Sequence, residues 1–317
     1  MSERPDFFHF VEGDVSSAAV AVPGGLSETR DTPAVAGVAL RRTVSGFGQW
    51  VSVTRFQLAH YLRTYRFLGL LLFVGLISAL TIAFELDAGV AAVRTQQLFS
   101  ASEYLSNFLD YSGLWIVLAA ALFGGDALSV DFSTGSGYYM LVLPVRRSVL
   151  LAGRYTAALL VSLAVVALYY AFGVGGATYF FGASAVPWSL LAASMGLAAL
   201  FTLAALSVAF CISAFFRSPA AGVLVTILAL YVGFTTLQGV VELAGIEPWF
   251  SLTYAGGAMA AVLDTDFLHY QSIPLGEDQY YTLWSASTAE GGVIMAVYAA
   301  VFLPLSGYLY HRKESVG

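Results

Sequence analysis

The chain of 317 residues is 58% hydrophobic and only 11% charged, with a mean hydropathy of +0.77. Soluble domains carry about 25% charged residues, so a water-facing surface over the whole chain is excluded. The acidic excess, with a formal net charge of -6, argues against nucleic acid as a partner. Apolar runs of about 18 to 29 residues are long enough to cross the roughly 30 Å hydrocarbon layer as helices. We therefore expect an all-α polytopic protein of the cell membrane.

The N-terminal 66 residues fall into two parts. Residues 1–48 are rich in Ser, Gly, Pro, Thr and acids without a helical or strand period, which predicts a disordered cytoplasmic tail ahead of one membrane domain at 49–317. Residues 49–66 instead predict an amphipathic interfacial helix that leads into the bilayer. Its apolar side would carry Trp50, Val53, Leu58, Tyr61, Leu62 and Tyr65, and its basic side Arg55, Arg63 and Arg66. The alternative is that this segment is only the basic flank of the first span.

Six apolar runs follow, and each predicts one transmembrane helix. The predicted spans are 67–84, 111–130, 155–181, 188–216, 220–241 and 292–310, and Asp126 is their only charged residue. Only Arg217, Ser218 and Pro219 join the fourth and fifth spans. Because proline cannot prolong the preceding helix, these two spans must form an antiparallel hairpin.

Two further segments are interpreted from their small residues. The glycine-rich piece 173–182 predicts close helix packing. Within the long connection 242–291, residues 246–263 predict a re-entrant or interfacial helical element, with an ordinary loop as the alternative. Glu242, at the start of this connection, is expected to be solvated.

The arginines predict the orientation of the spans. With both termini in the cytoplasm, every basic residue except Arg94 lies on the cytoplasmic side, as the positive-inside rule requires. Acidic residues gather on the opposite side. Asp264, Asp266, Glu277 and Asp278 match no calcium-loop spacing, so we expect a solvated acidic face there and not a metal site.

The connection between the second and third spans is unusual for a plain linker. It contains Asp126, Asp131, a Ser/Thr/Gly turn, the apolar piece 138–143, Pro144, Arg146 and Arg147. The apolar piece needs a surface to pack against, since each fully buried large apolar side chain is worth about 1.5–3 kcal/mol. We favour a cytoplasmic protein partner over the chain's own helices or the membrane surface. Asp126 would anchor this loop by pairing with Arg146 or Arg154, or else would be a solvated residue at the span end.

In these features the chain resembles the permease subunits of the ABC-2 class of ATP-binding-cassette transporters. Those proteins share a basic amphipathic entry helix, six spans, an acidic residue near the cytoplasmic end of the second span, and a loop with a Gly/Thr turn, a proline and basic residues. The resemblance covers residues 49–312. It implies that the loop is a coupling helix that docks on an ATPase. The coupling residues would be Asp126, Asp131, Thr134, Gly135, Leu141, Pro144, Arg146, Arg147 and Arg154.

The resemblance also implies a function. The chain would be the permease subunit of an exporter and would work as a homo- or heterodimer with separate ATPase subunits. ATP and magnesium are expected on that partner, because this chain has no G-x-x-x-x-G-K-[ST] loop. No catalytic, cofactor-binding or metal-binding residue is expected, since neither H-E-x-x-H nor G-x-S-x-G occurs. The alternatives are a secondary transporter or channel and a membrane scaffold without transport.

Overall fold

The computed structural model describes residues 45–90, 93, 100–130, 147–264, 267–274 and 280–314. These residues belong to one unit, Val44–Gly317. Of the tail predicted at 1–48, residues 1–44 lie outside the described residues, whereas 46–48 form the start of the first helix.

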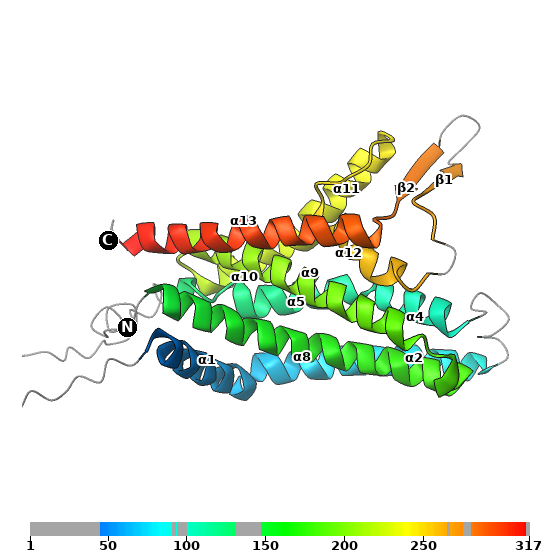
Figure 1. Cartoon of the computed structure of the whole chain (residues 1–317), viewed down its shortest axis with the longest axis horizontal. Helices are drawn as coiled ribbons and strands as arrows, with labels where there is room; N and C mark the ends of the chain where they lie inside the picture. The colour runs from blue at the N-terminus through cyan, green and yellow to red at the C-terminus, as the bar shows by residue number, and fades with distance from the viewer. Residues whose placement is uncertain are drawn as a thin grey trace, which may run out of the picture. The chain divides into compact units, whose positions relative to one another are not determined.

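Six helical segments of the described chain are long and apolar enough to cross a membrane (Figure 1). They are α2 (Tyr65–Ala88), the stacked pair α4 (Ala101–Asp110) and α5 (Ser112–Gly124), α8 (Arg147–Phe181), α9 (Trp188–Phe215), the series α10 (Pro219–Ile227), η2 (Leu228–Gly233) and α11 (Phe234–Leu243), and α13 (Thr288–Glu314). The protein is therefore a largely helical, multi-pass membrane protein, as the sequence predicts.

Two spans begin well before their predicted limits, by eight residues or more. The second span begins at Ala101, ten residues earlier than predicted, because α4 and α5 stack end to end with a break only at Tyr111. The third begins at Arg147. Hydropathy falls at charged residues, whereas a helix continues through them, so the prediction started both spans too late. Conversely, α5 ends at Gly124, so Asp126 lies in the turn after this helix and not inside it.

The spans divide into an inner and an outer set. In the second, third and fourth spans, 50–61% of the most apolar window is buried, against 11–22% in the first, fifth and sixth. Small residues allow the inner set to pack closely: a Cβ on Gly124 would lie 2.8 Å from the Cβ of Ala209, and Ala204 and Ala205 are fully buried. The outer spans are left to present apolar side chains to lipid.

The glycine-rich piece in α8 confirms the predicted close packing. A Cβ on Gly173 would lie 2.9 Å from the Phe108 ring, and one on Gly176 only 2.2 Å from the Tyr104 hydroxyl. Both aromatic residues belong to α4, so the two glycines let α4 approach α8.

Short elements lie between α11 and α13, at the end of the bundle opposite the C-terminus of α13 (Figure 1). The strands β1 (Tyr270–Pro274) and β2 (Tyr280–Trp284) form an antiparallel hairpin, which the sequence analysis did not predict. Tyr270 faces Trp284, and their ring centroids are 5.7 Å apart, an aromatic pair of the kind that stabilises cross-strand pairing. The helix α12 (Leu252–Ala261) lies within 246–263, where a helical element was predicted.

Candidate functional site

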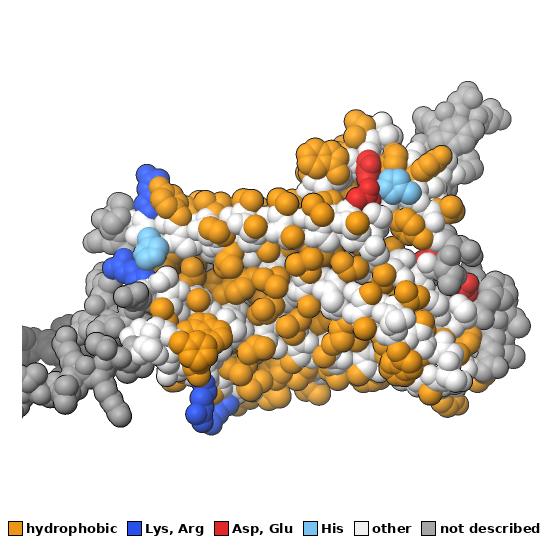
Figure 2. Space-filling view, in the orientation of Figure 1, with side chains coloured by type: hydrophobic (Ala, Val, Ile, Leu, Met, Phe, Trp, Pro, Cys, Tyr) orange, Lys and Arg blue, Asp and Glu red, His pale blue; other side chains and the backbone are white. Residues whose placement is uncertain are grey.

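Charged side chains of the described residues separate to the two ends of the bundle. We call the end that carries arginines the basic end and the end with the hairpin the acidic end. The basic end carries Arg55, Arg63, Arg66, Arg147, Arg154, Arg217 and Arg312. Figure 2 shows the same separation on one face, with blue side chains in the left part, beside α1 and the C-terminus of α13, and red ones in the right part, toward the hairpin. The positive-inside rule assigns the end with arginines to the cytoplasm, so the orientation of the termini stays a prediction.

At the basic end, α1 (Gly46–Arg63) lies along the first half of α8 (Figure 1). The indole Nε1 of Trp50 donates a hydrogen bond to Thr156 Oγ1 (3.3 Å). Gly153 leaves room for α1, since a Cβ there would lie 2.6 Å from Val53 Cγ1. Thr64 has an extended backbone and separates α1 from α2. The helix predicted at 49–66 is thus a distinct element, shifted toward the N-terminus.

The predicted apolar side of this helix is only partly buried. Tyr61 is buried and donates a hydrogen bond to the carbonyl of Phe123 (3.1 Å), and burial raises the pKa of Tyr61 to about 12. Leu62 is exposed, so it is free to face lipid, whereas Tyr65 belongs to α2 and not to α1. The extended residue Thr64 ends the helix three residues before Arg66, the predicted end of this helix.

Asp126 is buried and forms an ion pair with Arg66 in the first turn of α2. Burial raises the pKa of the Asp126 carboxyl above its ordinary value, and the Arg66 guanidinium opposes this shift. The predicted pairing with Arg154 is wrong, and Arg146 lies outside the described residues. The break at Thr64 starts α2 beside the end of α5, a proximity that no sequence spacing reveals.

The turn formed by residues 125–130, which follows α5, is held by two further helices. The buried Arg154 of α8 donates a hydrogen bond from Nη1 to the carbonyl of Ala127 (3.0 Å). In α9, the buried Ser213 Oγ accepts from the backbone N–H groups of Leu128 (3.0 Å) and Ser129 (3.2 Å). Together with the Asp126 pair, these bonds join the 125–130 turn to α2, α8 and α9.

The structure therefore places three of the nine predicted coupling residues. Asp126 and Arg154 meet at the 125–130 turn, and Arg147 is exposed at the start of α8. Asp131, Thr134, Gly135, Leu141, Pro144 and Arg146 lie outside the described residues. The sequence did not indicate Arg66 or Ser213 as partners of this turn. Arg66 is 60 residues from Asp126 in the sequence, and one serine in an apolar span does not indicate which residue it contacts.

The acidic end contains a cavity of about 440 Å³ between α4–α5, η2–α11, α12 and the hairpin. Its polar lining includes Asp110, Gln238, Thr253 and Asp264. Thr253 Oγ1 donates a hydrogen bond to Gln238 Oε1 (2.8 Å), and Gln238 Nε2 donates one to Glu242 Oε1 (2.8 Å). Glu242 is buried, so the expectation that it is solvated is wrong.

Serine hydroxyls hold α12 beside this cavity. Ser106 Oγ of α4 donates to the carbonyl of Ala260 (3.0 Å), and Ser194 Oγ of α9 donates to that of Met259 (2.6 Å). The last carbonyls of a helix have no partner within it, so these bonds satisfy the C-terminal end of α12.

The family model described as "Protein of unknown function (DUF2705)" matches residues 67–314. The chain belongs to the DUF2705 family. No curated protein matches the chain. The match begins in the first turn of α2 and ends with α13, so this DUF2705 region contains the 125–130 turn, the cavity and the six candidate spans except for Tyr65 and Arg66. Arg66 stands directly before the matched residues, and α1 lies outside them.

Proposed function

We propose that this DUF2705 chain is the permease subunit of an ATP-binding-cassette exporter, which works as a dimer with a separate ATPase on the cytoplasmic side. The observation that supports this proposal is the anchoring of the 125–130 turn, which leads directly into the predicted coupling residues 131–146. Asp126, Ala127, Leu128 and Ser129 contact three different helices within four consecutive residues.

A short segment fixed in this way can transmit movement. Packed interiors rearrange as rigid bodies between discrete states and do not deform elastically. A protein that moved residues 131–146 would therefore displace α2, α8 and α9 together with the 125–130 turn. Since α8 and α9 belong to the inner spans, the displacement would reach the centre of the bundle.

The energy for such a movement has to come from the partner. The chain contains no phosphate-binding loop of the Walker type, so ATP and magnesium would be bound by the ATPase. The residues that flank the connection 131–146 lie at the basic end, which would face the cytoplasm, where ATP is available, in the predicted orientation.

The outer surface of α2 offers a place for a second copy. Leu68, Leu72, Leu76 and Leu80 repeat at every fourth residue and are all exposed. Residues four apart lie on one face of a helix, so these leucines form a continuous apolar ridge. In the dimer that we propose, the path for the substrate would lie between two such bundles.

Copurification of the ATPase tests the proposal. The tagged full-length chain is purified from native membranes in mild detergent, and a bound Walker-type ATPase is identified by mass spectrometry and by nucleotide hydrolysis. Leu141→Asp should reduce the recovered ATPase by at least about tenfold, because a charge replaces an apolar contact of about 2 kcal/mol. Leu268→Asp is the matched control, since Leu268 is exposed at the acidic end. Absence of any ATPase, or equal loss in both variants, would contradict the proposal.

A secondary transporter is the second candidate, and the cavity at the acidic end favours it. Asp110 lies within the second span and lines this cavity, and ionisable residues at such positions often bind coupling ions. This function requires transport that follows an ion gradient without an ATPase. If Asp110→Asn abolished gradient-driven uptake into vesicles that contain only this chain, the secondary transporter would replace the exporter.

A further inference from the structure

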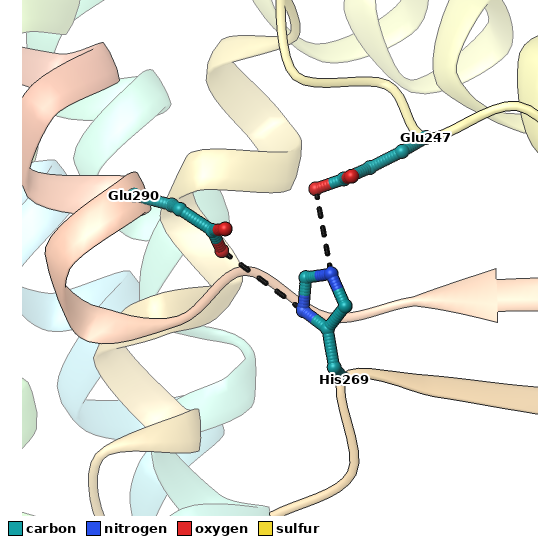
Figure 3. Close-up of side chains that lie close together, drawn as sticks. All are labelled: Glu247, His269 and Glu290. Atoms are coloured by element: carbon teal, nitrogen blue, oxygen red, sulfur yellow. Dashed lines mark ion pairs between the residues drawn. The ribbon is translucent and has the colours of Figure 1, made fainter.

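Three residues with metal-binding side chains converge at the acidic end, outside the cavity lining (Figure 3). Glu247 follows α11, His269 precedes β1, and Glu290 lies in the first turn of α13. His269 Nε2 is 3.7 Å from Glu247 Oε1, and its Nδ1 is 3.9 Å from Glu290 Oε2. One ligand atom from each residue lies within 4.8 Å of the other two. Glu247 and Glu290 are 43 positions apart in the sequence, with His269 between them, so only the fold brings the three together.

The imidazole of His269 is oriented by the backbone. Its Nδ1 is 3.1 Å from the carbonyl oxygen of Ser285, which can only accept a hydrogen bond, so Nδ1 carries the hydrogen. In the neutral ring, Nε2 then holds a lone pair directed toward Glu247 (Figure 3). Histidines that bind metals usually donate their other ring N–H to a carbonyl or carboxylate in this way.

Both carboxylates are also held by neighbours outside the cluster. The Tyr254 hydroxyl donates a hydrogen bond to Glu247 Oε1 (2.5 Å). The backbone N–H of Ser287 donates to Glu290 Oε2 (3.0 Å), and Ser287 Oγ accepts from the Glu290 N–H (3.3 Å), which is a capping box at the start of α13. Each of the three side chains is thus positioned by a second group, as in sites where the outer partners orient metal ligands.

We propose that Glu247, His269 and Glu290 bind one divalent transition-metal ion of the zinc type. One imidazole nitrogen with two carboxylates suits zinc or manganese, whereas calcium and magnesium prefer oxygen ligands alone. With ligand bonds of roughly 2.0–2.2 Å, neighbouring ligands of a tetrahedral zinc site lie about 3.4 Å apart. The 3.7 Å spacing between His269 Nε2 and Glu247 Oε1 is close to this value. Glu290 Oε2 lies 3.9 Å from Nδ1, so the half-exposed Glu290 side chain would turn toward Nε2 when the ion binds.

The ion would act as a structural clamp. The two carboxylates supply two negative charges, which balance the charge of a divalent cation. Such a site can bind the ion without being deeply buried. The three ligands belong to the connection after the fifth span, to the residue before the hairpin, and to the first turn of the sixth span. Binding would therefore tie the short elements of the acidic end to α13. This inference does not depend on the proposed transport function.

Metal binding by the purified full-length protein tests the site. Protein in detergent is stripped with EDTA and titrated with zinc chloride, and bound metal is measured by elemental analysis after gel filtration. We expect one zinc ion per chain, a raised melting temperature, and at least about tenfold weaker binding in His269→Ala and Glu247→Gln. His311→Ala is the matched control, because His311 is an exposed histidine at the basic end.

Cobalt substitution provides a readout that is independent of folding. Cobalt bound to His269 gives visible absorption bands that shift when this nitrogen ligand is lost, even in a variant with unchanged melting temperature. Zinc retained equally by His269→Ala, or no retained zinc in the wild-type chain, would overturn the proposal and leave only the two imidazole–carboxylate ion pairs. Calcium binding at the same site with higher affinity than zinc would also overturn it.

Discussion

The two ends of the bundle stabilise their polar groups in different ways. At the basic end, the polar contacts are buried and join long helices directly: Asp126 to α2, Arg154 to the turn after α5, and Ser213 to the same turn. At the acidic end, short elements lie between α11 and α13. Some of the polar side chains there, such as Glu247 and His269, are only partly buried.

We expect the basic end to be more rigid than the acidic end. A buried donor or acceptor that loses its partner costs about 1–3 kcal/mol, whereas a hydrated one recovers most of that energy from water. The basic end should therefore tolerate little change, which suits a region that transmits movement. The acidic end should accept substitutions more readily, which suits a region that binds an ion or a substrate.

Gly222→Ala should have the largest effect. A Cβ at Gly222 would lie 2.1 Å from the carbonyl oxygen of Gly125, and backbone cannot move aside as a side chain can. We expect a loss of about 3 kcal/mol or more in the free energy of unfolding, measured by thermal unfolding in detergent. Gly239→Ala in the same span is the control, since no atom lies within 4 Å of its Cβ position. A small and equal effect of both substitutions would show that α10 and the 125–130 turn are not in close contact.

Arg66→Gln tests the ion pair at the basic end. Removal of the guanidinium leaves the buried Asp126 carboxylate without its charged partner, so we expect a loss of about 2 kcal/mol. This is less than for a fully buried pair, because Arg66 is half-exposed and water reaches it. Asp126→Asn should cost less than Arg66→Gln, since a neutral amide is cheaper to bury than an unpaired charge. The reverse order of melting temperatures would refute this account.

The pH dependence of the same variant sharpens the test. The folded-state pKa of Asp126 is raised by burial, so protonation favours the folded state, and the stability it adds is lost as pH rises through that pKa. Removal of Arg66 takes away the group that opposes the shift and should raise the pKa further. The difference in melting temperature between Arg66→Gln and wild type should therefore shrink from about pH 7.5 to about pH 5. A constant difference would show that Asp126 is hydrated in the variant.

Ser213→Ala should have a smaller effect at the same turn. The substitution leaves the buried N–H groups of Leu128 and Ser129 without the hydroxyl that accepts from both. We expect a loss of about 1–2 kcal/mol, with faster hydrogen exchange at these two amides. Ser189→Ala is the control, because Ser189 is exposed in the first turn of α9. Unchanged exchange at both amides would mean that the serine does not hold the turn.

The sequence predicted the membrane spans well because their signal is local. A run of apolar residues long enough to cross the bilayer has no other stable environment, whatever the rest of the chain does. The spans 188–216 and 220–241 accordingly agree with α9 and α10–α11 to within two residues. The division into inner and outer spans could not be predicted, because the hydropathies of the two sets overlap. Only the helix contacts in the folded structure distinguish them.

Polar partners were predicted poorly, since they depend on long-range geometry. The charge of Asp126 was noticed, but its pairing with Arg66 depends on the backbone break at Thr64. The cluster of Glu247, His269 and Glu290 likewise has no characteristic spacing and forms only because the hairpin returns the chain to α13. The sequence can indicate that a charge in an apolar chain needs a partner, but not which residue provides it.

The smallest effect is expected from Tyr254→Phe, which forms a matched pair of Tyr→Phe substitutions with Tyr61→Phe, one at each end. Tyr61 donates to the buried carbonyl of Phe123, whereas Tyr254 donates to the partly exposed carboxylate of Glu247. The deleted hydroxyl leaves a buried acceptor in the first case and one that water can reach in the second. In metal-stripped protein, Tyr61→Phe should therefore cost about 1–2 kcal/mol and Tyr254→Phe less than about 1 kcal/mol. Equal losses in the two melting temperatures would mean that both ends bury their polar contacts alike, and the contrast between a rigid basic end and an adaptable acidic end would fail.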